Sequence, residues 1–247
     1  MERVSPLHSG GVMRGHSAGR TVRPMNEAIG QVLSLGVGVA LSPVPIIAVV
    51  LMLATPRARS NGPAFLAGWL AGLALAGTLV LLVSSGADAS TDDGPATWVS
   101  VLKLVLGLLL LGLALKQWRD RPTGDEEAAL PKWMQTIDTF GPPKALAFGV
   151  LLSAVNPKNL LLTVGAAAAI AQTGIDAGQQ AIALAVFVLV GTVGVGAPVV
   201  LYFALGERSR RLLDQLKRWM AAHNAAIMAV LLLVIGAKLL GDGIAGL

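Results

Sequence analysis

An uncharged stretch near the N-terminus is the feature that most constrains how this chain can fold. No charged residue occurs from Ala28 to Pro56, and the flanking charges are Glu27 and Arg57. The hydrocarbon core of a bilayer needs about 20 consecutive apolar residues per helix, so this stretch is long enough to cross it with some tilt. The stretch therefore predicts a membrane-spanning helix.

The overall composition agrees with a membrane protein. Hydrophobic residues make up 54% of the chain and charged residues only 13%, whereas soluble domains carry roughly a quarter charged residues. The mean hydropathy is +0.70. Together these values favour an integral membrane protein over a soluble enzyme.

Several classes of function are excluded by what the sequence lacks. It has no cysteine, and its histidines (His8, His16 and His223) are too scattered for a metal cluster. No Gly-x-x-x-x-Gly-Lys-Ser/Thr phosphate loop is present, so we expect no ATP hydrolysis. The net charge is +5, but the Lys and Arg residues lie between apolar runs, as in topology-setting loops, and do not indicate a nucleic-acid-binding patch. We predict no enzymatic activity, no cofactor or metal, and no nucleic-acid partner.

The hydropathy pattern predicts an all-α polytopic membrane protein with six spans. The apolar segments are Ala28–Leu53, Ala64–Val83, Trp98–Leu115, Ala145–Ala171, Ala181–Leu205 and Ala225–Gly246. They divide the chain into a first three-helix repeat (residues 25–115), a cytoplasmic linker (116–144) and a second three-helix repeat (145–247).

The polar segments carry predictions of their own. Residues 1–24 are polar and Gly-rich, which predicts a disordered tail, and initiation at Met25 would leave them untranslated. Residues 126–140 of the linker could form a short interfacial helix. Residues 207–223 place their apolar side chains on one helical stripe, which predicts an amphipathic segment resting on anionic headgroups.

Positive charges in the loops predict the orientation. All Lys and Arg residues in the connections follow the first, third and fifth segments, whereas the charged residues of the other connections are all acidic (Asp88, Asp92, Asp93 and Asp176). Basic loops face the cytoplasm. We therefore predict a multi-pass protein of the plasma membrane with both termini outside; the arginines of residues 1–24 oppose this assignment unless translation begins at Met25.

The two halves contain a short internal repeat. Gly38–Ile47 and Gly149–Lys158 share a Gly-to-Ser stretch, with prolines within four residues of the serine in both. Because each half has an odd number of spans, the two halves must be inverted relative to each other. Inverted repeats with broken helices at equivalent positions indicate a transporter whose substrate site lies between the repeats.

Lysine at the middle of the fourth segment is the most informative residue. Lys158 follows Pro157, which lacks an N–H and must kink or unwind the helix; Pro43 and Pro45 do the same in the first segment. A charge at this depth costs about 2.5–3.5 kcal/mol on insertion scales, and we expect no carboxylate counter-ion for it within the membrane. Two helix N-termini and an ammonium group would suit an anion. Alternatively, Lys158 binds carbonyls freed by the break, or is neutral.

The candidate substrate-binding residues therefore cluster at the two breaks. They are Ser42, Pro43, Pro45, Ser153, Asn156, Pro157, Lys158 and Asn159.

Small residues and terminal lysines have simpler interpretations. Gly68 and Gly72 lie on a small-residue face that predicts close helix packing, either within one bundle or in a homodimer. Gly191, Gly194, Gly196 and Pro198 predict a packing or hinge role for the fifth span. Lys103 and Lys238, near the outer ends of their spans, are expected to snorkel to the interface.

These residues resemble the LysE superfamily of small six-span exporters, on the strength of Ser42-Pro43-Val44-Pro45, the glycines that follow and Asn156-Pro157-Lys158. The block from Ser42 through Pro56-Arg-Ala-Arg to Trp69 looks more specifically like the GAP family, the peptidoglycolipid- and sulfolipid-addressing proteins of the actinobacterial envelope. The resemblance covers residues 28–247 and implies export or surface delivery of glycolipids. Pro-Val-Pro, where amino-acid exporters often show Pro-Gly-Pro, disfavours an amino-acid substrate.

Three functions follow as hypotheses. The leading one is a transporter or transport component that exports an anionic or amphipathic envelope (glyco)lipid or its precursor, with membrane lipids as partners. The first alternative is a LysE-like exporter of a small soluble solute. The second is a non-transporting accessory subunit of a larger lipid-export machinery.

Overall fold

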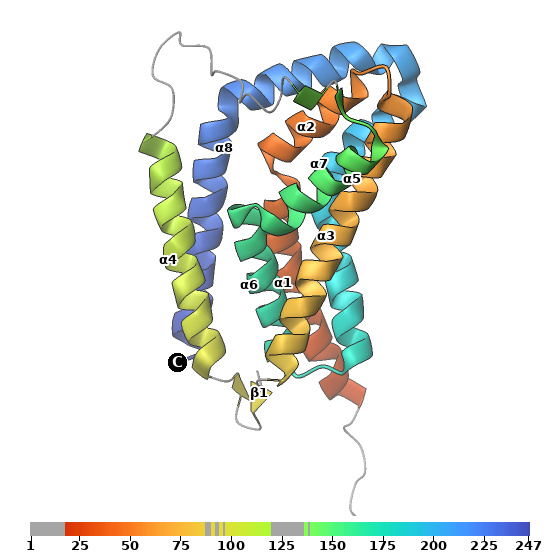
Figure 1. Cartoon of the computed structure of the whole chain (residues 1–247). Coiled ribbons are helices and arrows are strands. Elements are labelled where there is room, and N and C mark those ends of the chain that lie inside the picture. Colours follow the sequence, from red (N-terminus) through yellow and green to blue (C-terminus); the bar gives the residue numbers. More distant parts are fainter. Residues whose placement is uncertain (1–17, 87–89, 92–93, 96, 120–135, 138) are drawn as a thin grey trace, which may run out of the picture.

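The computed structural model describes residues 18–86, 90–91, 94–95, 97–119, 136–137 and 139–247 (Figure 1). This part of the chain forms a bundle of helices around a buried apolar core. The helices are α1 (Ala18–Ala40), α2 (Pro43–Leu53), α3 (Ala58–Gly86), α4 (Thr97–Arg119), α5 (Pro142–Val150), α6 (Pro157–Gln172), α7 (Ala177–Leu205) and α8 (Ser209–Ala245). A π-helical turn, η2 (Leu151–Val155), follows α5, and a 3-10 turn, η3 (Gly206–Arg208), precedes α8.

Helix lengths agree with a multi-pass membrane protein. Four helices (α3, α4, α7 and α8) are long and apolar enough to cross a bilayer, and the number rises to six if each of two bent pairs makes one span. The bent pairs are α1 with α2, at 53°, and α5 and η2 with α6, at 61°. The start of α1 and the C-terminus lie at the same end of the bundle (Figure 1).

Proline and glycine set several of the helix boundaries. Pro43, Pro142 and Pro157 each occupy the first turn of a helix, where the missing N–H has no intrahelical partner to lose. Gly206, the residue at which α7 ends and η3 begins, has a φ of +53°, which a residue with a Cβ rarely adopts. A two-stranded antiparallel ladder, β1 (Ser90–Thr91) with β2 (Gly94–Pro95), lies between α3 and α4.

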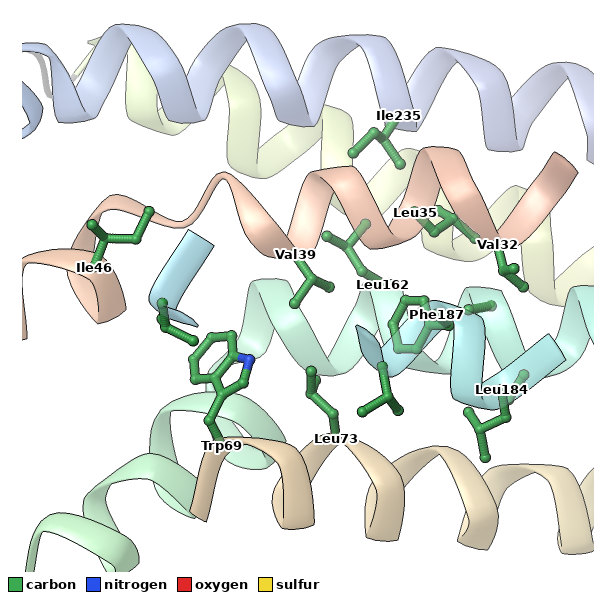
Figure 2. Close-up of a cluster of buried hydrophobic side chains, with 14 of the residues drawn as sticks. Val32, Leu35, Val39, Ile46, Trp69, Leu73, Leu162, Leu184, Phe187 and Ile235 are labelled. Atoms are coloured by element: carbon green, nitrogen blue, oxygen red, sulfur yellow. The ribbon is translucent and has the colours of Figure 1, made fainter. Parts of the chain in front are cut away.

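Helix α2 is the most deeply packed element. Nine of its residues are buried, including Ala48, Val49 and Met52, which have no exposed surface. The apolar core continues along α1, α3, α6 and α7, with Val39, Trp69, Leu162 and Phe187 among its members (Figure 2). Burial of α2 on all sides explains why its sequence is apolar throughout and has no amphipathic pattern.

Glycines bring neighbouring helices into backbone contact. A Cβ at Gly68 would lie 2.0 Å from the carbonyl oxygen of Leu146 in α5, and a Cβ at Gly194 would lie 1.8 Å from that of Ala40 in α1. A Cβ at Gly191 would lie 3.1 Å from the Val39 side chain. The packing roles predicted for the small-residue faces of the second and fifth spans are therefore confirmed, and α7 is a continuous helix through Pro198.

The amphipathic segment before the last span is the first part of α8. It runs across one end of the bundle over α2, and α8 then turns and descends beside α4 (Figure 1). Leu213 and Met220 are buried, whereas Leu212 and Trp219 are more than half exposed. The apolar stripe thus packs partly against the protein, and part of it is exposed.

Two predicted segments differ from the described structure or lie largely outside it. Helix α1 begins at Ala18, inside the range 1–24 for which no helix was expected, and residues 1–17 lie outside the described residues. Most of the interfacial helix predicted for residues 126–140 also lies outside them, and only 136–137 and 139–140 are described.

Candidate functional site

Both predicted breaks are present, and each places a residue with non-helical backbone angles before a proline. Ser42 precedes Pro43 with φ −100° and ψ 102°, and Asn156 precedes Pro157 with φ −57° and ψ 121°. Proline disfavours helical geometry in the residue before it, which accounts for the position of both breaks. The breaks are therefore built by the local sequence.

Broken helices leave backbone carbonyls without donors, and side chains replace those donors here. Pro43 has no N–H for Val39 O, and the Ser42 hydroxyl lies 2.7 Å from that oxygen. The π-helical partner of Leu152 O would be Pro157, and the Asn159 side-chain amide donates to that oxygen instead, at 2.9 Å. In a dry interior such groups must be paired, so these side chains make the breaks tolerable.

Lys158 connects the two breaks. Its ammonium group donates to the Gly38 carbonyl at 2.7 Å and to the Ser42 hydroxyl at 2.6 Å, and the residue is only 5% exposed. The Ser42 hydroxyl also lies 3.0 Å from Asn159 Oδ1. Because Ser42 accepts from Lys158, its single proton is shared between Val39 O and Asn159 Oδ1. We call Ser42, Lys158 and Asn159 the break cluster.

Lys158 binds a carbonyl freed by a break, that of Gly38, as in one of the alternatives given above. Gly38 lies in the last turn of α1, where carbonyls lack helical donors. The helix N-termini are poorer in donors than expected, since Pro43 and Pro45 have no N–H and Ile46 N is bonded to Ser42 O. Within the described residues, no ion pair to Lys158 is present.

The remaining predicted site residues surround the cluster without joining it. Asn156 caps α6 by accepting from Lys158 N at 3.1 Å. Ser153 is fully buried and bonds Val150 O within its own helix, at 3.1 Å. Pro157 is exposed and Asn156 half-buried, so this break lies at the side of the bundle, with Lys158 and Asn159 directed inward.

Trp69 is a potential site residue that the sequence analysis missed. The residue is fully buried, and its indole Nε1 has no hydrogen-bond partner. Its ring projects from α3 into the buried apolar cluster, with the nitrogen on the side of Val39 and Leu73 (Figure 2). An orphaned buried donor costs about 1–3 kcal/mol. A tryptophan within the small-residue face of α3 was the available sequence signal.

One of the two terminal lysines differs from expectation. Lys103 does not snorkel: it is 3% exposed and donates to Gln172 at the end of α6. Lys238 pairs with Asp242 at 2.6 Å on the next turn of α8. The carboxylate of Asp242 thus lies within the last predicted segment, where it pairs with Lys238 and not with Lys158. Burial of Lys103 follows from the packing of α4 against α6 and α8, which sequence alone does not specify.

The fold and the break cluster together define a multi-pass helical membrane protein with two interrupted helices held together by a buried lysine. The family model described as "Sap, sulfolipid-1-addressing protein" matches residues 32–245. The chain belongs to this family, which confirms the family predicted from the sequence. Neither the curated proteins nor the solved structures contain a match to the chain.

Proposed function

We propose that this chain is a transporter, or the membrane component of one, that exports an anionic or amphipathic cell-envelope (glyco)lipid or its precursor. The observation that carries the proposal is the buried ammonium of Lys158, which reaches from one broken helix to the other. Removing an ammonium from water costs several kcal/mol, and carbonyl and hydroxyl partners do not neutralise its charge. Such a group at membrane depth is best explained by an anion that visits it.

The proposed mechanism is an exchange of partners at Lys158. With no substrate bound, Gly38 O and Ser42 Oγ hold the ammonium and keep the two breaks together. A sulfate, phosphate or carboxylate would replace the Gly38 carbonyl, because an anionic acceptor forms a stronger bond to an ammonium than a neutral one. Release of Gly38 would free α1 and α2 to move relative to α6.

Access from the side of the bundle supports a lipid as the substrate. Pro157 and Val155 are exposed beside the break, one to three residues from Lys158. A headgroup could enter here while its acyl chains stay in the bilayer. The orphaned indole of Trp69 offers a second buried donor, suited to a headgroup with several acceptor oxygens.

Apolar surfaces favour a lipid over a small soluble solute. A groove of about 500 Å³ between α4 and α8 is lined only by apolar side chains (Leu111, Ala114, Leu115, Trp118, Ala229, Val230 and Leu233). It provides a place for an acyl chain. The family description, which names a sulfolipid, supports the same class of ligand.

An inverted-repeat architecture is consistent with the packing. Helix α3 packs against α5, the first half of the broken fourth span, as α7 packs against α1, the first half of the broken first span. In each pair a glycine meets a backbone carbonyl: Gly68 meets Leu146, and Gly194 meets Ala40. A two-fold axis in the membrane plane would superimpose the pair of α3 and α5 on the pair of α7 and α1. We further propose a plasma-membrane location with both termini outside, from the loop charges.

Transport can be tested with purified protein in liposomes. A fluorescent sulfated glycolipid would report movement between leaflets, and parallel vesicles loaded with small anions or amino acids would report efflux. We expect lipid movement without solute efflux. Lys158→Met should reduce lipid movement to the protein-free level, whereas Lys144→Met makes the same change at an exposed lysine at the start of α5 and should leave it unchanged.

Other outcomes select the alternatives. Solute efflux without lipid movement would identify a small-solute exporter. Absence of both activities, with co-purification of a large transporter from the native membrane, would identify an accessory subunit. Full lipid transport by Lys158→Met would contradict the proposed exchange.

A further inference from the structure

A second pocket lies at the end of the bundle, away from the break cluster. It forms where the first part of α8 crosses the C-terminal end of α2 (Figure 1) and has a volume of about 250 Å³. The lining residues are Val50, Leu51, Leu53, Ala54, Arg210, Leu213, Asp214 and Lys217. Since α2 has 11 residues, this pocket is about 16 Å along the helix axis from the break at Ser42. It is therefore a separate site.

The pocket has two chemically different walls. Helix α2 and Leu213 supply apolar side chains, and α8 supplies Arg210, Asp214 and Lys217. Asp214 forms one ion pair with Lys217 at 2.9 Å and another with Arg218 at 2.6 Å. Arg210 and Lys217 both line the pocket, and Asp214 divides its charge between Lys217 and Arg218, which lies outside the lining. The charged wall is therefore suited to an anion.

We propose that this pocket binds the headgroup of an anionic lipid, with Arg210 and Lys217 on the headgroup and the first part of an acyl chain against α2. An apolar floor beside a basic wall matches a ligand that is amphipathic and negatively charged. The segment that carries the basic residues lies across the bundle end, where lipid headgroups lie in a spanning protein. The choice of ligand rests on the proposed transport of an anionic lipid, and the pocket would be where that lipid docks before it reaches Lys158.

Binding can be measured apart from transport. The full-length protein in phosphatidylcholine nanodiscs would be titrated with the soluble short-chain lipid dihexanoyl phosphatidylglycerol, with retention read by native mass spectrometry. Arg210→Gln and Lys217→Gln should each weaken binding about fivefold, since each removes one partly solvated charge contact. Asp214→Asn should strengthen it, because the carboxylate competes with the headgroup for Lys217.

Arg211→Gln is the matched control. Arg211 is the exposed neighbour of Arg210 and does not line the pocket, so its loss should leave the affinity unchanged. Equal weakening by Arg211→Gln and Arg210→Gln would mean general surface attraction and would overturn the proposal. So would weaker binding by Asp214→Asn, or glycerol 3-phosphate binding as tightly as the lipid, because the apolar wall would then contribute nothing.

The two proposals can fail separately. Lys158→Met should abolish transport but leave binding of dihexanoyl phosphatidylglycerol intact. If Arg210→Gln binds the lipid normally, the proposed docking site is contradicted, but the proposed exchange at Lys158 is not affected. Pocket binding without lipid movement in wild-type vesicles would contradict the transport function alone.

Discussion

The ammonium of Lys158 donates a 2.7 Å hydrogen bond to the carbonyl oxygen of Gly38, a residue in the other half of the chain. One bond thus joins the end of α1 to the beginning of α6 at the point where both bent helix pairs are interrupted. It satisfies a carbonyl that the helix cannot satisfy, and it holds a charge where water is excluded. A conformational change that separates the two breaks must break it.

Removing the charge of Lys158 should abolish transport with little effect on stability. In Lys158→Met, the unpaired Gly38 carbonyl costs about 1–3 kcal/mol, but the loss of a desolvated ammonium returns a similar amount. We expect little change in the midpoint of thermal unfolding in detergent, together with loss of lipid movement. A collapse of stability without any transport defect in the remaining folded protein would indicate a purely structural lysine.

Ser42 should matter to stability more than an ordinary serine. Ser42→Ala removes the hydroxyl at Val39 O and one acceptor of Lys158, both in a buried position. We expect a loss of about 1–3 kcal/mol in the free energy of unfolding, measured by chemical denaturation. The control is Ser60→Ala, which removes a comparable bond to Arg57 O at an exposed site and should cost much less. Equal losses would contradict a special role for the break cluster.

Glycines that meet backbone atoms should not tolerate a methyl group. Gly68→Ala and Gly194→Ala place a Cβ within 2.0 Å and 1.8 Å of carbonyl oxygens in neighbouring helices, so the helices must separate. We expect a destabilisation of about 1–3 kcal/mol for each, by the same denaturation measurement. Gly112→Ala meets nothing within 4 Å and should instead stabilise the protein by up to about 1 kcal/mol, through helix propensity.

The indole nitrogen of Trp69 should affect substrate affinity. Trp69→Phe removes an unpaired buried N–H while keeping an aromatic ring. The desolvation cost of that N–H disappears, which offsets part of the stability lost with the packing of the larger indole. We expect near-normal stability and a several-fold higher lipid concentration for half-maximal transport. Trp219→Phe, at an exposed position in α8, is the control. Unchanged concentration dependence in Trp69→Phe would exclude contact with the headgroup.

Local sequence was sufficient to place the breaks. Pro43 and Pro157 constrain the residues before them whatever the surroundings, and both helices bend where expected. The position of Lys158 at mid-span followed from counting along one apolar run. The environment of Lys103 could not be predicted in this way. Its position near the end of its segment predicted an exposed ammonium, whereas in the structure the group is buried and contacts Gln172 of α6.

What the sequence by itself determined is the apolar spans, their proline interruptions and a cation at membrane depth, because length, hydropathy and the missing N–H of proline act within a single segment. Only the tertiary structure decided the partners of that cation. Gly38 and Ser42 are more than a hundred residues from Lys158, and their contact depends on how α1 and α6 pack. The same holds for the unpaired indole of Trp69 and for the pocket that α8 closes over α2, since each arises only when separate helices meet.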